Sequence, residues 1–89
     1  MQKGNLSREQ VINIVGAAAV DVAEATEPVQ TGRLTNDGTV EFVARHECTD
    51  KDGESVTLCV FWYFSEGAVM AEEDLSNLDW DDISGYDVN

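Results

Sequence analysis

Hydrophobic and polar positions alternate along residues 39–49, and this is the clearest pattern in the chain. One face of the segment carries Val40, Phe42, Ala44, His46 and Cys48, and the other carries Glu41, Val43, Arg45 and Glu47. A period of two predicts a β-strand with one buried side. Residues 55–64 are rich in β-branched and aromatic side chains, which favours a second strand. Asp50-Lys51-Asp52-Gly53 lies between them, so we predict a β-hairpin with Gly53 at positive φ.

The register of this hairpin follows from the same pattern. Pairing Val40 with Phe64 groups apolar residues on one face of the ladder, where Val40, Phe42, Ala44, His46 and Cys48 lie opposite Phe64, Trp62, Val60, Leu58 and Val56. A shift by one residue would instead place Glu41 opposite Trp62 and Arg45 opposite Leu58. We therefore predict the first register, which gives the sheet an apolar face around Trp62.

A helix is predicted before the hairpin. Ser7 and Gln10 have the spacing of a capping box, and Leu6 suits a hydrophobic staple with the first apolar residue of the helix. Apolar residues at helical spacing follow at Val11, Ile14, Val15, Ala18, Val22 and Ala25. Pro28 disfavours helical geometry at the residue before it, so we predict that the helix ends near Thr26. This helix should pack on the Trp62 face of the sheet.

Shorter elements are expected around this frame. Arg33-Leu34-Thr35 is predicted as a short strand before a turn at Asn36-Asp37-Gly38, and Ser65-Glu66-Gly67 as a turn. Residues 71–78 are predicted as a short helix, and the tail has enough apolar residues to dock on the sheet. The predicted fold is α+β, a single domain over residues 1–89. An N-terminal amphipathic helix packs on a small antiparallel sheet of three or four strands with a central hairpin, followed by an acidic C-terminal segment.

Charge is distributed unevenly along the chain. Residues 1–51 hold eight acids and five bases, a net charge of −3, whereas residues 52–89 hold ten acids and no Lys, Arg or His, which completes the total of −13. Such a negative pole attracts cations and basic protein surfaces and repels nucleic acids and anionic membranes. Adaptation to high salt is an alternative explanation that needs no partner.

The chain has no segment of the length that crosses a bilayer. Its longest apolar stretches are Ala17–Val20 and Cys59–Phe64, against the roughly 20 residues that a membrane helix needs. The N-terminus lacks the basic and apolar regions of a signal peptide. We expect a cytoplasmic protein, or a protein of the host cytoplasm if it is encoded by a phage.

Residues suited to catalysis or metal binding are few. His46 is the one histidine, and Cys48 lies on the same strand face, so a Cys/His pair is one hypothesis for a small enzyme or metal protein. Structural zinc usually takes four ligands, and Cys59 belongs to the opposite face, which disfavours both a zinc site and a disulfide. Asp50-Lys51-Asp52-Gly53 lacks the flanking acids of a calcium loop. We expect no enzyme activity, no catalytic residue, no cofactor and no metal.

A protein-interaction function is the leading prediction. In size, acidity and architecture the chain resembles phage inhibitors of restriction and CRISPR systems, which occlude nucleic-acid-binding grooves, although no motif assigns it to a family. In that hypothesis carboxylates imitate phosphates for a basic partner, and aromatic residues provide an apolar anchor. The predicted partner-binding residues are Glu72, Glu73, Asp74, Asp79, Trp80, Asp81, Asp82, Phe61 and Tyr63. The alternatives are a homodimer or larger assembly that uses the Phe61/Tyr63 face, and the His46/Cys48 enzyme or metal protein.

Overall fold

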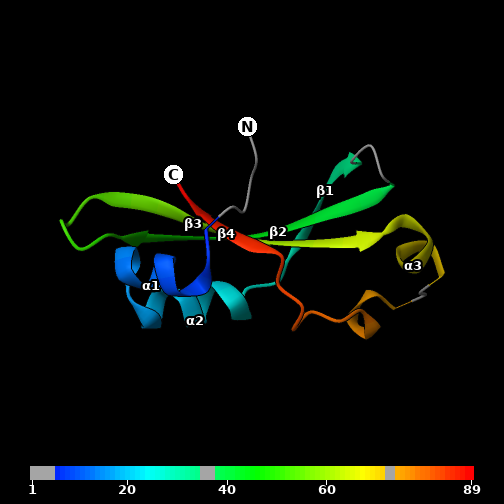
Figure 1. The fold of residues 1–89 in the computed structure, drawn as a ribbon, viewed down its shortest axis with the longest axis horizontal. Helices are drawn as coiled ribbons and strands as arrows, with labels where there is room; N and C mark the ends of the chain where they lie inside the picture. Colours follow the sequence, from blue (N-terminus) through cyan, green and yellow to red (C-terminus); the bar gives the residue numbers. More distant parts are fainter. Residues whose placement is uncertain (1–5, 35–37, 72–73) are drawn as a thin grey trace.

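The computed structural model describes residues 6–34, 38–71 and 74–89. Four strands form one antiparallel sheet in the order β1-β2-β3-β4. The strands are β1 (Val29–Leu34), β2 (Thr39–Thr49), β3 (Ser55–Ser65) and β4 (Gly85–Val88), and the helices are α1 (Arg8–Val15), α2 (Ala17–Ala25) and α3 (Glu66–Ala71). Figure 1 shows α1 and α2 under one half of the sheet and the segment before β4 under the other half. The predicted α+β class is confirmed.

The central hairpin of β2 and β3 has the predicted register. Val40 lies opposite Phe64, and the pairing continues without a shift to Thr49 and Ser55. In the turn, one carboxylate oxygen of Asp50 accepts hydrogen bonds from the backbone N–H groups of Asp52 and Glu54, both at 2.9 Å. Gly53 has φ +84°, the left-handed conformation that glycine adopts at low cost.

The prediction of one continuous N-terminal helix is wrong. Its start is correct: the Ser7 hydroxyl accepts the Gln10 N–H at 3.2 Å, and the Gln10 side chain accepts the Ser7 N–H at 2.8 Å. However, Gly16 has φ +92° and ψ 155°, which ends α1 and begins α2. The apolar spacing continues across this glycine and therefore conceals the break. α2 ends at Ala25, close to the predicted boundary.

Both edges of the sheet differ in extent from the prediction. The strand expected near Arg33 begins already at Val29 and pairs with β2, with a register irregularity between Gln30 and Leu34. The predicted turn after it lies outside the described residues except for Gly38, which has φ +77°. The C-terminal tail forms β4 beside β3, and Leu6 makes an isolated bridge to Tyr86.

The segment after β3 contains a helix where a turn was predicted. α3 begins directly at Glu66 because the Ser65 hydroxyl accepts the Ala68 N–H at 3.2 Å, as an N-cap does. In the described part of residues 71–78 the predicted helix is also wrong, since α3 ends at Ala71 and Leu75–Asn77 forms a 3-10 turn.

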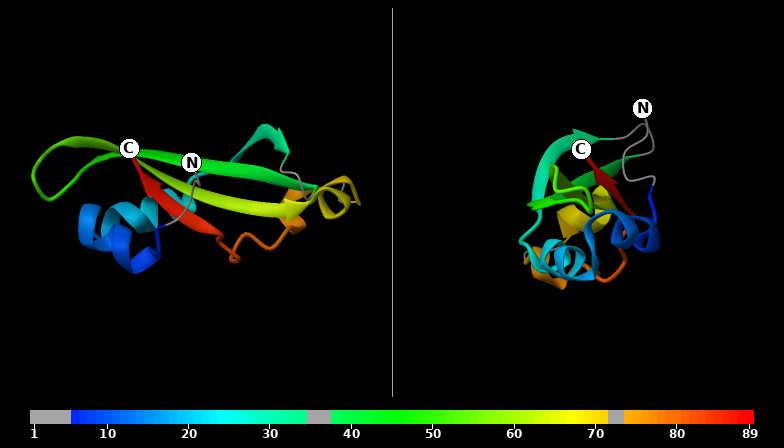
Figure 2. Two further views of the ribbon diagram at one scale, coloured as in Figure 1. Left: turned by 45° about the horizontal axis from the view of Figure 1, so that its top comes forward. Right: turned by 90° about the vertical axis from the view of Figure 1, so that its left-hand side faces the viewer.

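The main core lies between the sheet and its lower layer, as predicted for the Trp62 face. Val11, Val20 and Ala23 from the helices are fully buried against sheet residues such as Leu58 and Trp62. The helices cover the half of this face nearest the hairpin turn (Figure 2). Within the described residues, no helix has both the length and the apolar character to cross a bilayer.

The opposite face of the sheet carries a second, smaller core. Val43, Cys59 and Phe61 are buried there, with Tyr63 packed against them. Glu41 is also buried, at 2% exposure. Its carboxylate accepts hydrogen bonds from the Thr31 hydroxyl and the Tyr63 hydroxyl, each at 3.0 Å. A buried carboxylate needs such donors, because an unpaired one costs several kcal/mol or more.

Candidate functional site: the acidic layer

Carboxylates gather on the layer that covers the Trp62 face of the sheet. Residues 6–28 and 74–84 form this layer, and together they contain eight acids and one base, Arg8, a net charge of −7. We call it the acidic layer; its carboxylates belong to Glu9, Asp21, Glu24, Glu27, Asp74, Asp79, Asp81 and Asp82. All are exposed except Glu24, which is half-buried. In contrast, Glu41 on the other face is buried, and the exposed Arg45 follows it on the same strand.

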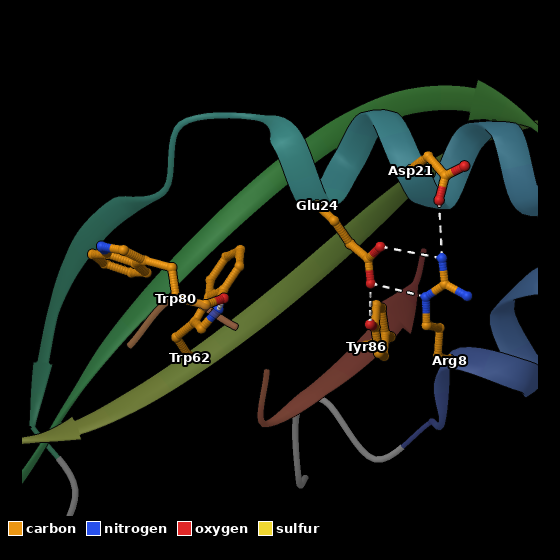
Figure 3. Close-up of polar contacts among 6 residues, drawn as sticks. All are labelled: Arg8, Asp21, Glu24, Trp62, Trp80 and Tyr86. Carbon is orange, nitrogen blue, oxygen red and sulfur yellow. Dashed lines mark hydrogen bonds and ion pairs between the residues drawn. The ribbon is translucent and has the colours of Figure 1, made fainter. Parts of the chain in front are cut away.

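Trp80 fixes the C-terminal part of the layer to the sheet. Its ring lies 5.1 Å from that of Phe42, 5.6 Å from that of Trp62 and 5.0 Å from that of Phe64, each at an interplanar angle above 80°. Such edge-to-face pairs place the positive edge of one ring on the negative face of the other. The Trp62 indole N–H also donates to the Trp80 carbonyl at 2.7 Å (Figure 3). The acidic segment is therefore attached through both a side chain and its backbone.

Local hydrogen bonds order the chain on either side of Trp80. The Asp74 carboxylate accepts the N–H and the hydroxyl of Ser76, at 3.0 and 2.8 Å. The hydrogen bond from the Ser76 backbone N–H and, after it, the bond from the Ser76 hydroxyl lower the pKa of Asp74 and so favour its charged form. Further on, the Ser84 N–H donates to the Phe61 carbonyl at 2.8 Å, and the Ser84 hydroxyl accepts the Tyr63 N–H. The backbone that carries the carboxylates between Asp74 and Ser84 is therefore fixed by hydrogen bonds on both sides.

The helical part of the layer centres on Glu24. Arg8 contacts its carboxylate through Nε at 3.0 Å and also contacts Asp21 at 2.9 Å, while the Tyr86 hydroxyl donates to Glu24 at 2.5 Å (Figure 3). Burial alone would raise the pKa of Glu24, but the hydrogen bonds from Arg8 and Tyr86 together lower it. Burial, and then the bond to Glu24, raise the pKa of Tyr86 well above its usual range.

Two hollows join the helical and C-terminal parts of the layer. The first, of about 450 Å³, is lined by Arg8 and Glu24 on one side and by Asp81 and Asp82 on the other. The second, of about 330 Å³, is lined by Glu27, Pro28, Phe42, Asp74, Ser76 and Trp80. Carboxylates that are more than 45 positions apart in the sequence therefore share a hollow in each case.

Comparisons with protein-family models, with curated proteins and with solved structures find no match to this chain.

The predicted partner-binding residues fall into three groups. Asp74, Asp79, Asp81 and Asp82 are exposed on the acidic layer. Trp80 is half-buried in the aromatic core, and Phe61 is only 3% exposed on the other face of the sheet, with Tyr63 beside it. Glu72 and Glu73 lie outside the described residues.

Sequence reasoning missed the contribution of the helices. Asp21, Glu24 and Glu27 belong to the same layer as the C-terminal acids, although they lie in the less acidic half of the chain. Their helical spacing on the polar side of the N-terminal segment was the one available signal. This spacing does not reveal that the polar side of the helices lies next to residues 74–82, because the tertiary fold brings the two segments together.

The residues considered for catalysis or metal binding, His46, Cys48 and Cys59, line neither of the two hollows of the acidic layer. His46 pairs with Leu58 and Cys48 with Val56 in the hairpin, and Cys48 and Cys59 form no disulfide within the described residues. Burial is the main cause that raises the pKa of the Cys48 thiol, which disfavours the reactive thiolate. Among the described residues, no three His, Cys, Asp or Glu side chains are grouped as a metal site would require.

Proposed function

We propose that this protein is a non-enzymatic interaction module whose acidic layer binds a basic protein surface in place of a nucleic acid. The observation that carries the proposal is that Glu24 on α2, and Glu27 just after α2, each share a hollow with carboxylates from residues 74–82. Seven exposed carboxylates and Glu24 on one layer, against the single Arg8, give it the negative sign of a phosphate backbone.

The attachment of the acidic segment supports this proposal over a purely solubilising role. A flexible polyanion loses conformational entropy when it binds, about 0.5–1.5 kcal/mol for each side chain that becomes immobilised, with further cost for the backbone. Here the backbone on both sides of Trp80 is already held by hydrogen bonds. Carboxylates on an ordered backbone lose less conformational entropy on binding. They also favour a partner whose basic residues have matching positions.

The class of partner follows from the charge. A surface of net charge −7 attracts a groove lined with Lys and Arg, such as one that binds DNA or RNA, and repels the nucleic acid itself. We therefore propose a basic nucleic-acid-processing complex as the partner, with restriction or CRISPR enzymes as the first group to examine.

The test is inhibition of such enzymes. The purified protein is added to a panel of restriction and CRISPR nucleases, and DNA binding and cleavage are measured at several salt concentrations. The proposal expects competition with DNA that weakens as salt rises, because exposed charges are screened over about 8–10 Å at 0.10–0.15 M salt.

Two matched variants make this test specific. The first replaces Asp79, Asp81 and Asp82 by Asn and should inhibit at least tenfold more weakly. The second replaces the exposed Glu47, Asp52 and Glu54 by the corresponding amides, which changes the net charge equally but outside the layer. Inhibition that is equal in the two variants, or that does not respond to salt, would contradict the proposal.

The homo-oligomer remains a separate prediction. Phe61 and Val43 are already buried within one chain, so their burial does not itself require a second copy. Sedimentation at micromolar concentration separates a monomer from an assembly through the Phe61/Tyr63 face.

A further inference from the structure

The second hollow of the acidic layer combines aromatic and acidic groups. Phe42 is buried and Trp80 half-buried, so their rings form its deep part, beside Pro28. Glu27 and Asp74 are exposed and form its rim. The two carboxylates come from distant parts of the chain and meet here because Trp80 docks on Phe42, with ring centroids 5.1 Å apart.

This composition selects an organic cation. Carboxylates at the rim repel anions, and the oxygen atoms of Glu27, Asp74 and Ser76 are too few for the roughly six to eight ligands that Ca²⁺ takes. A cation above an indole face is attracted by the ring quadrupole, by about 0.5–1 kcal/mol at an exposed site. The volume of about 330 Å³ lies at the lower end of the range for ligand sites, roughly 300–1,000 Å³.

Among organic cations, a guanidinium group matches the hollow best. It is planar, so it can stack on an indole while its N–H groups point sideways to carboxylates, and it is less strongly hydrated than an ammonium group. The Asp74 side chain accepts both hydrogen bonds from Ser76 on one oxygen, Oδ1, so neither of these bonds engages Oδ2.

We propose that the hollow between Glu27 and Asp74 binds one arginine side chain of the partner, stacked on Trp80. This inference rests on the proposed function and deepens it, since it names the residue type that the acidic layer recognises. It also gives Trp80 a second role, because the same indole that anchors the segment forms part of the arginine site.

The test uses N-acetyl-arginine methylamide as the probe and the neutral citrulline analogue as its control. Titration is followed by the NMR signal of the Trp80 indole N–H, assigned by comparison with Trp80→Phe. The arginine probe should shift this signal with saturation in the millimolar range, and the citrulline analogue should not.

The double variant Glu27→Gln, Asp74→Asn tests the rim without altering the core, and the side-chain amide introduced at position 74 can still accept the Ser76 bonds through its oxygen. We expect about 2- to 30-fold weaker binding, since each of the two exposed charge pairs contributes roughly 0.2–1 kcal/mol. Its control is Asp52→Asn, Glu54→Gln, which removes the same charge at the hairpin turn and should bind as the wild type does. Thermal unfolding of each variant verifies that it is folded.

Equal responses to arginine and citrulline, or equal affinity in the two double variants, would overturn the arginine site. An arginine-rich peptide separates this failure from that of the proposed function. In one outcome the small probe does not bind, while the peptide still binds Glu27→Gln, Asp74→Asn in a salt-sensitive way. That result would overturn the arginine site and leave the acidic layer as the interface. Absence of binding by both probe and peptide would overturn both proposals.

Discussion

Trp80 should hold the acidic segment to the sheet, and Trp80→Ala removes that attachment. Truncating a fully buried Phe or Trp to Ala costs about 3–5 kcal/mol. Because Trp80 is only half-buried, its cost falls at or below the lower end of this range, which already includes the loss of its edge-to-face contacts with Phe42, Trp62 and Phe64. We therefore expect the free energy of unfolding to fall by about 2–3 kcal/mol.

Urea unfolding followed by circular dichroism measures this loss. A small domain exposes surface corresponding to about 1–3 kcal/mol per molar urea, so the midpoint should fall by about 1–2 M. Hydrogen exchange locates the effect: amides of residues 74–84 should lose protection more than those of the hairpin. The Trp62 indole N–H, which donates to the Trp80 carbonyl at 2.7 Å, should exchange faster as well.

Met70→Ala is the matched control, because Met70 is a large apolar residue that is 77% exposed. Its effect should stay within about 0.5 kcal/mol, as for most surface substitutions. A Trp80→Ala variant that unfolds like this control, with protection unchanged over residues 74–84, would refute the reasoning that the indole holds the acidic segment in place.

Four further substitutions test the rest of the fold. Gly16→Ala should lower the unfolding free energy by about 1–3 kcal/mol because of its φ of +92°, whereas Gly67→Ala in α3 should be neutral or stabilising, and urea titration compares the two. Ser7→Ala should cost about 1 kcal/mol through loss of the N-cap of α1, and retention of full stability would contradict that role. Tyr86→Phe should cost about 1–2 kcal/mol, the scale of a hydrogen bond to a charged group. Because the pKa of Glu24 is lowered in the folded state, the stability that its charge contributes is present above its unfolded pKa and is lost as pH falls through its folded pKa. Because the pKa of Tyr86 is raised, the stability that its protonated hydroxyl contributes is lost at high pH. The difference from wild type should therefore be largest between about pH 5 and pH 9, and a difference that is constant with pH would contradict it.

The sequence predicts best the elements whose hydrophobic pattern is strong and local. The hairpin register follows from alternation alone, because a one-residue shift would place Glu41 and Arg45 opposite the wrong residues. The capping box at Ser7 is likewise local. The break at Gly16 is not, because a single glycine is tolerated within many helices and the apolar spacing continues past it.

The edge strands and the site depend on tertiary contacts. β1 and β4 are short or irregular, and neither alternates clearly, so their pairing becomes visible only once β2 and β3 are in place. For the site, the sequence indicates an acidic C-terminal half. The structure replaces this with a layer in which Glu24 and Glu27 accompany the C-terminal acids, and it places Phe61 in the interior.

The central claim is that the acidic layer, rather than acidity in general, binds a basic partner. Chemical-shift mapping with an arginine-rich peptide tests it most directly, at low and at high salt. The account predicts shifts confined to residues 8–27 and 74–84 at low salt, which disappear at high salt and in the variant with Asn at positions 79, 81 and 82. Shifts spread over Arg45, Glu47 and the hairpin turn, or shifts that persist at high salt, would contradict it.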